Sequence, residues 1–165
     1  MNDSDLLDGY SADFAPNTYL LTYNPRFWAW DDYDEFLDQV RRERLFEGQW
    51  STGSRVNDIG PGDEVFLLRQ GREPRGIIAR GLVASEVYED ETWLEDGTSR
   101  LANYVDVDWK EAVPLTDPLP LAALQAGTPD APKSTWEPQS SGTRIAQENA
   151  IIASLLWLQH LRKAT

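Results

Sequence analysis

Apolar and polar positions recur along this chain with two different periods. The run TYLLTY at residues 18–23 is almost wholly apolar or aromatic and ends at Asn24-Pro25, which predicts a buried strand. In DDYDEFLDQVRRER, residues 31–44, apolar side chains recur at i, i+3, i+4 and i+7, the spacing of an amphipathic helix. Acidic residues fill its first turn and arginines its last turn, the arrangement that the helix dipole favours.

A polar segment with one large aromatic side chain follows that helix. EGQWSTGSR, residues 47–55, places Trp50 among Gly, Ser and Thr, a composition typical of a solvated loop. The pattern recurs in TPDAPKSTWEPQSSG, residues 128–142, where Trp136 is the lone aromatic residue. A tryptophan in a loop either folds back onto the core or offers its ring face to a partner, so both are candidate binding residues.

The remaining segments predict a curved sheet and two more helices. Residues 62–70 and 75–89 indicate a long antiparallel hairpin, and residues 104–113 a strand with one buried face. A short helix is expected within residues 117–127. A second, longer excursion of the chain, residues 90–103, separates the hairpin from the later strand.

The C-terminal segment predicts an amphipathic helix over residues 144–163, capped by Thr143 and with Ile152 and Leu155 on its apolar side. Together with the other two helical segments this makes three helices. The expected fold class is therefore α+β, with a small and strongly curved antiparallel sheet of five to six strands.

Length and composition describe one domain. Residues 1–16 are acidic and lack periodicity, so we expect a flexible tail followed by a single domain over residues 17–165. The chain has no cysteine, which excludes disulfides, thiolate metal sites and cysteine nucleophiles. No apolar run reaches the roughly 18 residues of a membrane span, and the first residues lack the features of a signal peptide. We therefore expect a cytoplasmic protein.

The net charge of −13 restricts the partners of the chain. A protein held to nucleic acid mainly by phosphate contacts should be basic, so a nucleic-acid role here must depend on a local site. Residues 69–80 indicate such a site, because Arg69, Arg72 and Arg75 form a basic stripe on an acidic body.

Few residues indicate catalysis. The single histidine, His160, is late in the last predicted helix, where a solvated or capping role is expected. Asp108 to Lys110 match the D-x-K half of a metal-dependent nuclease motif, in which Asp106 and Asp108 would hold Mg²⁺ and Lys110 would stabilise charge. Alternation along a half-buried strand explains these residues better. We expect no enzyme, no metal site and no cofactor.

The aromatic residues are more informative. Trp109 and Trp157 fit the core. Trp28 and Trp30 precede the first helix, and for this pair a core role and a binding role are about equally favoured. An aromatic wall suits a planar base, because stacking contributes roughly 1–3 kcal/mol per base and needs no charge. A methyl group on the base adds about 0.8 kcal/mol through burial.

The ordered set of segments resembles a known family. YLLTYNP, WSTGSR, GDEVFLLRQG, GIIARGLVASEVYED, YVDVDW and WEPQSSGTRI occur in the order found in EVE domains, over about residues 18–160. EVE domains are PUA-like folds related to YTH and ASCH domains, which implies a small PUA-like β-barrel with flanking helices. The chain looks closest to the EVE-like modified-base readers associated with HNH endonucleases. It departs from the family at WSTGSR, where many EVE domains carry a Trp-Asp-Gly-Val-Arg-Asn-like run.

The resemblance implies a non-catalytic reader of a modified base, methylated (as in 5-methylcytosine) or hydroxymethylated and flipped out of its strand. In the family, the segment at Trp50-Ser51 lines the pocket and the segment at residues 140–142 forms the opposite lip. The expected pocket residues are Tyr23, Asn24, Trp28, Trp30, Trp50, Ser51, Trp136, Gln139, Ser141 and Gly142. The expected phosphate-binding residues are Arg69, Arg72 and Arg75.

The expected partner is nucleic acid carrying a modified base, with DNA favoured over RNA. An HNH-type nuclease domain or subunit is a second expected partner, as in a modification-dependent restriction system. Two alternatives stay open. One is a protein- or small-molecule-binding PUA-like domain, which the net charge of −13 favours. The other is a metal-dependent nuclease that uses Asp106, Asp108 and Lys110.

Overall fold

The computed structural model describes residues 16–94 and 96–163, and this part of the chain forms eight strands and three α-helices. The strands are β1 (Thr18–Tyr23), β2 (Phe46–Gly53), β3 (Glu64–Arg69), β4 (Gly76–Val83), β5 (Tyr88–Trp93), β6 (Ser99–Ala112), β7 (Leu119–Pro120) and β8 (Thr143–Ile145). The helices are α2 (Tyr33–Glu43), α3 (Leu121–Gly127), the 3-10 helix η1 (Lys133–Trp136) and α4 (Gln147–Lys163). None of these helices is long and apolar enough to cross a membrane. Apart from Pro16, the predicted acidic tail lies outside the described residues.

The strands form one curved sheet in the order β2-β6-β4-β3-β1-β8, with β5 paired to β6 and β7 paired to β4. The expected α+β class with three helices is confirmed. The strand number differs from the five to six predicted. β2 lies where a loop was predicted, and β7 and β8 have two and three residues and are too short to show a period. β1 and β3 pair in parallel, so the sheet is not wholly antiparallel.

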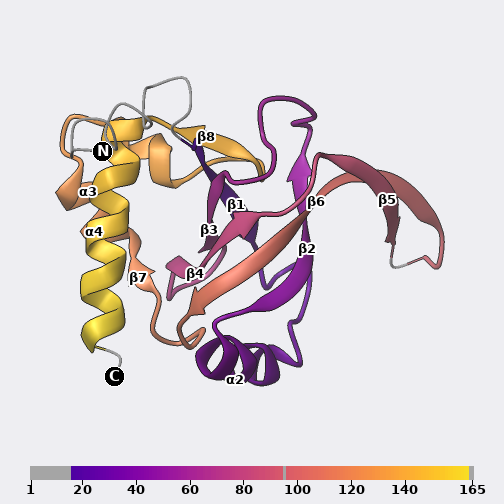
Figure 1. Ribbon diagram of the computed structural model, residues 1–165, viewed down its shortest axis with the longest axis horizontal. Helices are drawn as coiled ribbons and strands as arrows, with labels where there is room; N and C mark the ends of the chain where they lie inside the picture. Colours follow the sequence, from indigo (N-terminus) through magenta and orange to yellow (C-terminus); the bar gives the residue numbers. More distant parts are fainter. Residues whose placement is uncertain (1–15, 95, 164–165) are drawn as a thin grey trace, which may run out of the picture.

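The elements of the sheet are covered unequally. Figure 1 shows α3 and α4 on one side of the molecule and α2 at the lower end of the sheet. The hairpin of β5 and β6 projects from the opposite side, away from the helices. Trp157 of α4 packs edge-to-face on Phe66 of β3, with ring centroids 6.4 Å apart. The core therefore lies under the helices, and the hairpin extends beyond it.

Helix α2 follows its sequence pattern. Its buried side chains are Tyr33, Phe36, Leu37 and Val40, the predicted apolar stripe. The helix ends where Arg44 adopts a left-handed conformation, with φ of 55°, and donates its N–H to the carbonyl of Val40 at 2.8 Å. Two further rings, Phe46 and Trp109, meet Phe36 edge-to-face and join α2 to β2 and β6.

The C-terminal helix differs from the prediction in its start and in its buried face. Thr143 is not a helix cap, because it begins β8, which pairs antiparallel with β1. The buried residues of α4 are Ala150, Ala153 and Trp157. Leu155, expected on the core side, is 54% exposed. Small alanine side chains let the helix approach its neighbours closely. The prediction chose the larger apolar residues as the buried face and therefore missed the alanines.

Trp50 lies in a strand, so the prediction of a loop is wrong. β2 pairs with β6 and places Trp50 opposite Val105. A Cβ atom added at Gly48 would lie 3.3 Å from the indole nitrogen of Trp109. Glycine therefore lets that ring pack against the strand. The Gly, Ser and Thr residues here reflect close packing and not a solvated loop.

Candidate functional site

Side chains close a seam between β1, β2 and the segment that precedes β8. The backbone N–H of Thr22 donates to the Ser141 hydroxyl at 3.1 Å, and its carbonyl accepts the Trp50 indole N–H at 3.0 Å. The Ser141 hydroxyl donates to the Ser51 carbonyl at 2.7 Å. We call Thr22, Trp50, Ser51 and Ser141 the seam. The Ser141 hydroxyl was expected to read a base, but its proton is already used in the seam.

Gly142 fixes the position of Ser141. Its N–H donates to the Leu20 carbonyl at 2.8 Å, and its φ of +88° is a conformation that side-chain-bearing residues rarely adopt. A Cβ atom at this position would collide with the carbonyl oxygen of Thr52. Gly142 therefore lies behind the lip and supports it.

A row of aromatic rings leads from the core to the surface. Trp109, which is 2% exposed, meets Trp50 at 6.2 Å between ring centroids, and Trp50 meets Trp30 at 5.3 Å. Trp30 stacks on Trp28 at 5.2 Å, and Trp28 is 49% exposed. Tyr23 contacts three of these tryptophans edge-to-face, with centroid distances from 5.5 to 6.4 Å. The core thereby holds the outermost ring, Trp28, in a fixed orientation.

This row opens into a cleft of about 720 Å³ beside the seam. The volume is within the range of about 300–1,000 Å³ that small-ligand sites occupy. Seven of the predicted pocket residues line it: Tyr23, Asn24, Trp28, Trp50, Ser51, Gln139 and Ser141. Every described residue that lines the cleft is aromatic or carries a neutral polar group, and none of them is charged.

Three predicted pocket residues do not line the cleft. Trp136 is 1% exposed, and its indole N–H donates to the Thr128 hydroxyl at 2.9 Å. This contradicts its predicted role, because the ring is buried in the core. The polar residues next to Trp136 in the sequence give no sign of this burial. Trp30 lies in the row behind Trp28, and Gly142 lies behind Ser141.

Sequence reasoning missed other residues of the cleft. They are Thr22, Phe27, Gln49, Gln70, Thr92, Trp93, Tyr104 and Ser140. Trp93 belongs to β5 and is 70% exposed, and Phe27 belongs to the turn after β1 and is 77% exposed. An exposed tryptophan in an acidic segment was a usable signal, but only the hairpin brings Trp93 to the cleft.

Side-chain amides supply groups that could contact the edge of a ligand. The Gln70 amide nitrogen donates to the Pro138 carbonyl at 2.7 Å, and that of Gln49 donates to side chains of β5 at 3.0 Å. The Asn24 side-chain oxygen accepts the N–H of Arg26 at 3.0 Å. Within the described residues, these bonds leave the oxygens of both glutamines and the nitrogen of Asn24 available to a ligand.

The basic stripe is largely neutralised inside the protein. Arg69 is 8% exposed and donates to the Leu115 carbonyl at 2.7 Å, which contradicts its predicted contact with phosphate. Arg75 pairs with Glu73 at 3.0 Å and with Glu137 at 3.3 Å. The backbone N–H and guanidinium of Arg75 also lower the pKa of Glu73. Glu137 is distant in sequence, so this neutralisation could not be predicted.

Two other cations adjoin the cleft. Arg26 and Arg72 line a hollow of about 520 Å³ with Gly71, which lies against the Asn24 side chain. The Arg26 guanidinium lies over the Phe27 ring, 5.7 Å from its centroid. Both arginines are exposed, and neither forms an ion pair with a described residue. Arg72 was predicted as a phosphate ligand, and Arg26 was missed.

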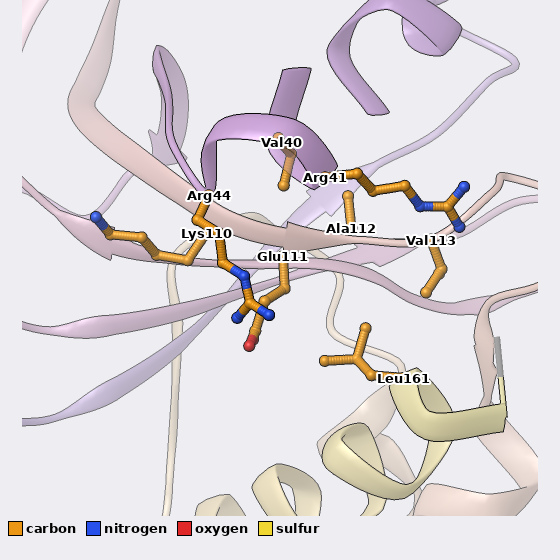
Figure 2. A pocket seen from close by; sticks show the side chains of 8 residues that line it. All are labelled: Val40, Arg41, Arg44, Lys110, Glu111, Ala112, Val113 and Leu161. Atoms are coloured by element: carbon orange, nitrogen blue, oxygen red, sulfur yellow. The ribbon is translucent and has the colours of Figure 1, made fainter. Parts of the chain in front are cut away.

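The residues of the alternative nuclease motif line two different hollows. Asp106 and Asp108 line one over β6, and the Asp106 carboxylate accepts the Tyr88 hydroxyl at 2.6 Å. Lys110 lines another of about 310 Å³, where α2, the end of β6 and α4 meet (Figure 2). Among the described residues, no group of three or more His, Asp or Glu side chains could hold a metal ion.

Comparisons with known proteins agree with this architecture. Protein PSPTO5229 from Pseudomonas syringae is 16% identical, covers 84% of this chain and 99% of its own, and superposes with a TM-score of 0.54. Human THYN1, solved in complex with DNA containing 5-methylcytosine, is 15% identical over 87% of this chain and 97% of its own, with a TM-score of 0.49. A comparison with curated proteins found no match.

The sequence itself matches one family model. The EVE domain model matches residues 17–150, which include the seam, the row of aromatic rings and every residue that lines the cleft. This span is most of the chain. The protein therefore belongs to the EVE domain family, with its PUA-like fold.

Proposed function

We propose that this EVE domain is a non-catalytic reader that holds a modified nucleic-acid base in the cleft. The observation that carries the proposal is the lining, in which the described residues combine aromatic faces with neutral amides and hydroxyls and none is charged. A base has a neutral, planar ring with donors and acceptors along its edge, so it matches both kinds of surface. A methyl group on that ring adds about 0.8 kcal/mol of burial.

The energetic terms are of the right size for such a reader. Taking a base out of a stacked strand costs a few kcal/mol. Stacking on a ring contributes roughly 1–3 kcal/mol, and the cleft offers Trp28, Trp50 and Trp93 for this contact. The free amide atoms of Asn24 and Gln70 supply one donor and one acceptor for the edge of the base.

The same lining argues against the protein- or small-molecule-binding alternative for cationic ligands. A net charge of −13 would favour a basic partner in general. However, no described residue lines the cleft with a carboxylate that could pair with a buried cation. A neutral ligand with an aromatic ring fits these residues better.

Phosphate contacts are assigned to Arg26 and Arg72, which line the hollow next to the cleft. Arg75 is held by two carboxylates and Arg69 is buried, so we no longer propose them as phosphate ligands. Two cations are few, and the affinity must then come mainly from the base itself.

The test is a binding titration of the purified chain with short DNA strands that differ at one central base. Cytosine, 5-methylcytosine, 5-hydroxymethylcytosine, adenine and N6-methyladenine are compared by fluorescence anisotropy. 5-Methylcytosine is included because it is the modified base in the DNA bound to human THYN1. We expect at least one modified base to bind about tenfold more tightly than its plain counterpart, a difference of about 1.4 kcal/mol.

Trp28→Ala should remove this preference, because the ring that stacks on the base is lost. Leu101→Ala is the matched control, since Leu101 is 64% exposed and does not line the cleft. A wild-type chain without preference, or a Trp28→Ala variant that keeps it, would sink the proposal.

We further infer that the reader serves an HNH-type nuclease partner as its specificity module, and that it performs no cleavage itself. The support is the resemblance of its ordered segments to readers of that kind. Incubation of the purified chain with modified DNA and Mg²⁺ should leave the DNA intact. Cleavage that disappears in Lys110→Ala would instead support the nuclease alternative.

A further inference from the structure

We propose that the cleft takes its base from a single-stranded or locally unpaired nucleic acid and not from an intact duplex. This inference rests on the proposed function and names the class of nucleic acid that the same site accepts. It follows from the charges on the two surfaces beside the cleft, which we call its walls although their described charged side chains do not line the cleft itself, and from the exposed rings on its lips.

One wall is the acidic part of the hairpin where β5 pairs with β6, residues 88–104. Trp93 of this hairpin lines the cleft, and Asp90 accepts the Gln49 amide at 3.0 Å directly beside it. The exposed acidic residues of the described hairpin are Glu89, Asp90, Glu91 and Asp96. Arg100 is the one cation in the same described segment. This wall therefore repels phosphate groups.

The other wall is acidic as well. The row of rings on this side continues directly into the start of α2, because Trp30 stacks on Trp28 and meets Tyr33 of the helix at 4.8 Å. The exposed acidic residues at this helix start are Asp31, Asp32, Asp34 and Glu35. Carboxylates thus lie on the hairpin beside the cleft and at the helix start next to the row of rings.

Arg26 and Arg72, which form no ion pair with a described residue, line their hollow at one end of the cleft. Another group of cations, Arg41, Arg44 and Lys110, surrounds the separate hollow shown in Figure 2. That hollow shares no lining residue with the cleft. The basic surface that these two residues form near the base is therefore small.

These charges favour single-stranded over double-stranded nucleic acid. Duplex DNA carries one charge per roughly 1.7 Å of its axis, so its second strand would bring phosphates against at least one acidic wall. A single strand has half this charge density and can bend so that its phosphates pass Arg26 and Arg72. The acidic walls then disfavour the duplex more than the single strand.

Exposed rings on the lips favour the same substrate. Phe27 is 77% exposed on one lip, and Trp93 is 70% exposed on the other. Unpaired bases on either side of the central base can stack on such rings, and this stacking tolerates any sequence. In an intact duplex the same bases already stack on one another, so the rings gain less.

The test uses four probes that carry the same modified base, run for 5-methylcytosine and for N6-methyladenine. They are an 11-nucleotide single strand, the fully paired duplex, a duplex with the base in a mismatch, and the free nucleoside. We expect the single strand to bind about tenfold or more tightly than the duplex, and the mismatch to lie between them. A duplex that binds as tightly as the single strand overturns the inference and leaves the proposed function in place.

A chain that binds none of the four probes overturns both. Phe27→Ala should weaken the single strand by about fivefold or more, since one base loses its stacking partner. The affinity for the free nucleoside should stay within about twofold, because a nucleoside has no neighbouring base to stack. Equal losses for both probes would show that Phe27 contacts the modified base itself and would contradict its assigned role.

The charge of the hairpin is tested by the double variant Glu89→Gln and Glu91→Gln. It should raise the duplex affinity more than the single-strand affinity and so narrow the ratio between them. Glu148→Gln, at the exposed start of α4, is the control and should leave the ratio unchanged. An unchanged ratio in the hairpin variant would contradict the electrostatic part of the inference.

Discussion

Arg72 and Arg26 are the two side chains from which we expect phosphate contacts, and each can be tested alone. Arg72→Ala should weaken modified and plain single strands equally, because phosphate contacts carry no sequence information directly. Arg75→Ala is the control, since its guanidinium is already engaged by Glu73 and Glu137. Anisotropy titrations of both strands give the two ratios. A change in preference in Arg72→Ala would instead place Arg72 at the base.

Gly142 permits a second test at the scale of one residue. Gly142 and Gly97 have nearly equal φ values, +88° and +85°, but only Gly142 has a backbone neighbour where a Cβ would lie. Gly97→Ala should cost about 1–2 kcal/mol of unfolding free energy through backbone strain. Gly142→Ala should cost clearly more, because Thr52 must also move. Urea unfolding of both variants measures these costs. Equal losses of unfolding free energy would mean that the backbone at residue 142 can move away from Thr52 without disturbing the seam.

At the scale of elements, Tyr88 anchors β5 to β6. Its hydroxyl donates to Asp106 at 2.6 Å and accepts the Gln49 amide at 3.0 Å. Burial and the bond to Asp106 raise its pKa from 10.0 to about 12. The unfolded chain then loses this proton first as the pH rises. The stabilising contribution of Tyr88 is therefore fully present below pH 10 and is lost as the pH rises to about 12.

Urea unfolding of the wild type and of Tyr88→Phe between pH 9 and about 12 measures this contribution. The decline of unfolding free energy with pH should be shallower in Tyr88→Phe. Burial also raises the pKa of Tyr33. Because Tyr33 is present in the wild type and in Tyr88→Phe, its contribution cancels when the two unfolding free energies are subtracted. Identical slopes would show that the contact between Tyr88 and Asp106 does not persist in solution.

The elements also show how far the sequence alone predicts this protein. β1 and α2 follow from local pattern, because β1 is a nearly continuous buried run and α2 buries a regular apolar stripe. Trp136 and Arg69 could not be assigned, because their burial depends on Thr128 and Leu115, whose positions only the tertiary structure sets. The cleft was predicted in part, since its inner rings lie near β1 and α2 while Trp93 comes from a distant hairpin.

For the whole molecule, the main expectation concerns salt. With about two phosphate contacts, the logarithm of the affinity for a single strand should fall with the logarithm of salt concentration with a slope of about −1.4. A broad basic surface would give a much steeper slope. Titrations at salt concentrations between about 50 and 300 mM distinguish the two slopes. A steep slope would mean that cations outside the hollow of Arg26 and Arg72 contact the nucleic acid.

The shared role of Trp50 links recognition to folding. The same indole donates to the Thr22 carbonyl in the seam and lines the cleft. Any attempt to redesign specificity through this residue would therefore also change the stability of the fold, and selection for one property would act on the other. Asn24 and Gln139 line the cleft without belonging to the seam. At such positions a new preference can evolve, or be engineered, without changing the bonds of the seam.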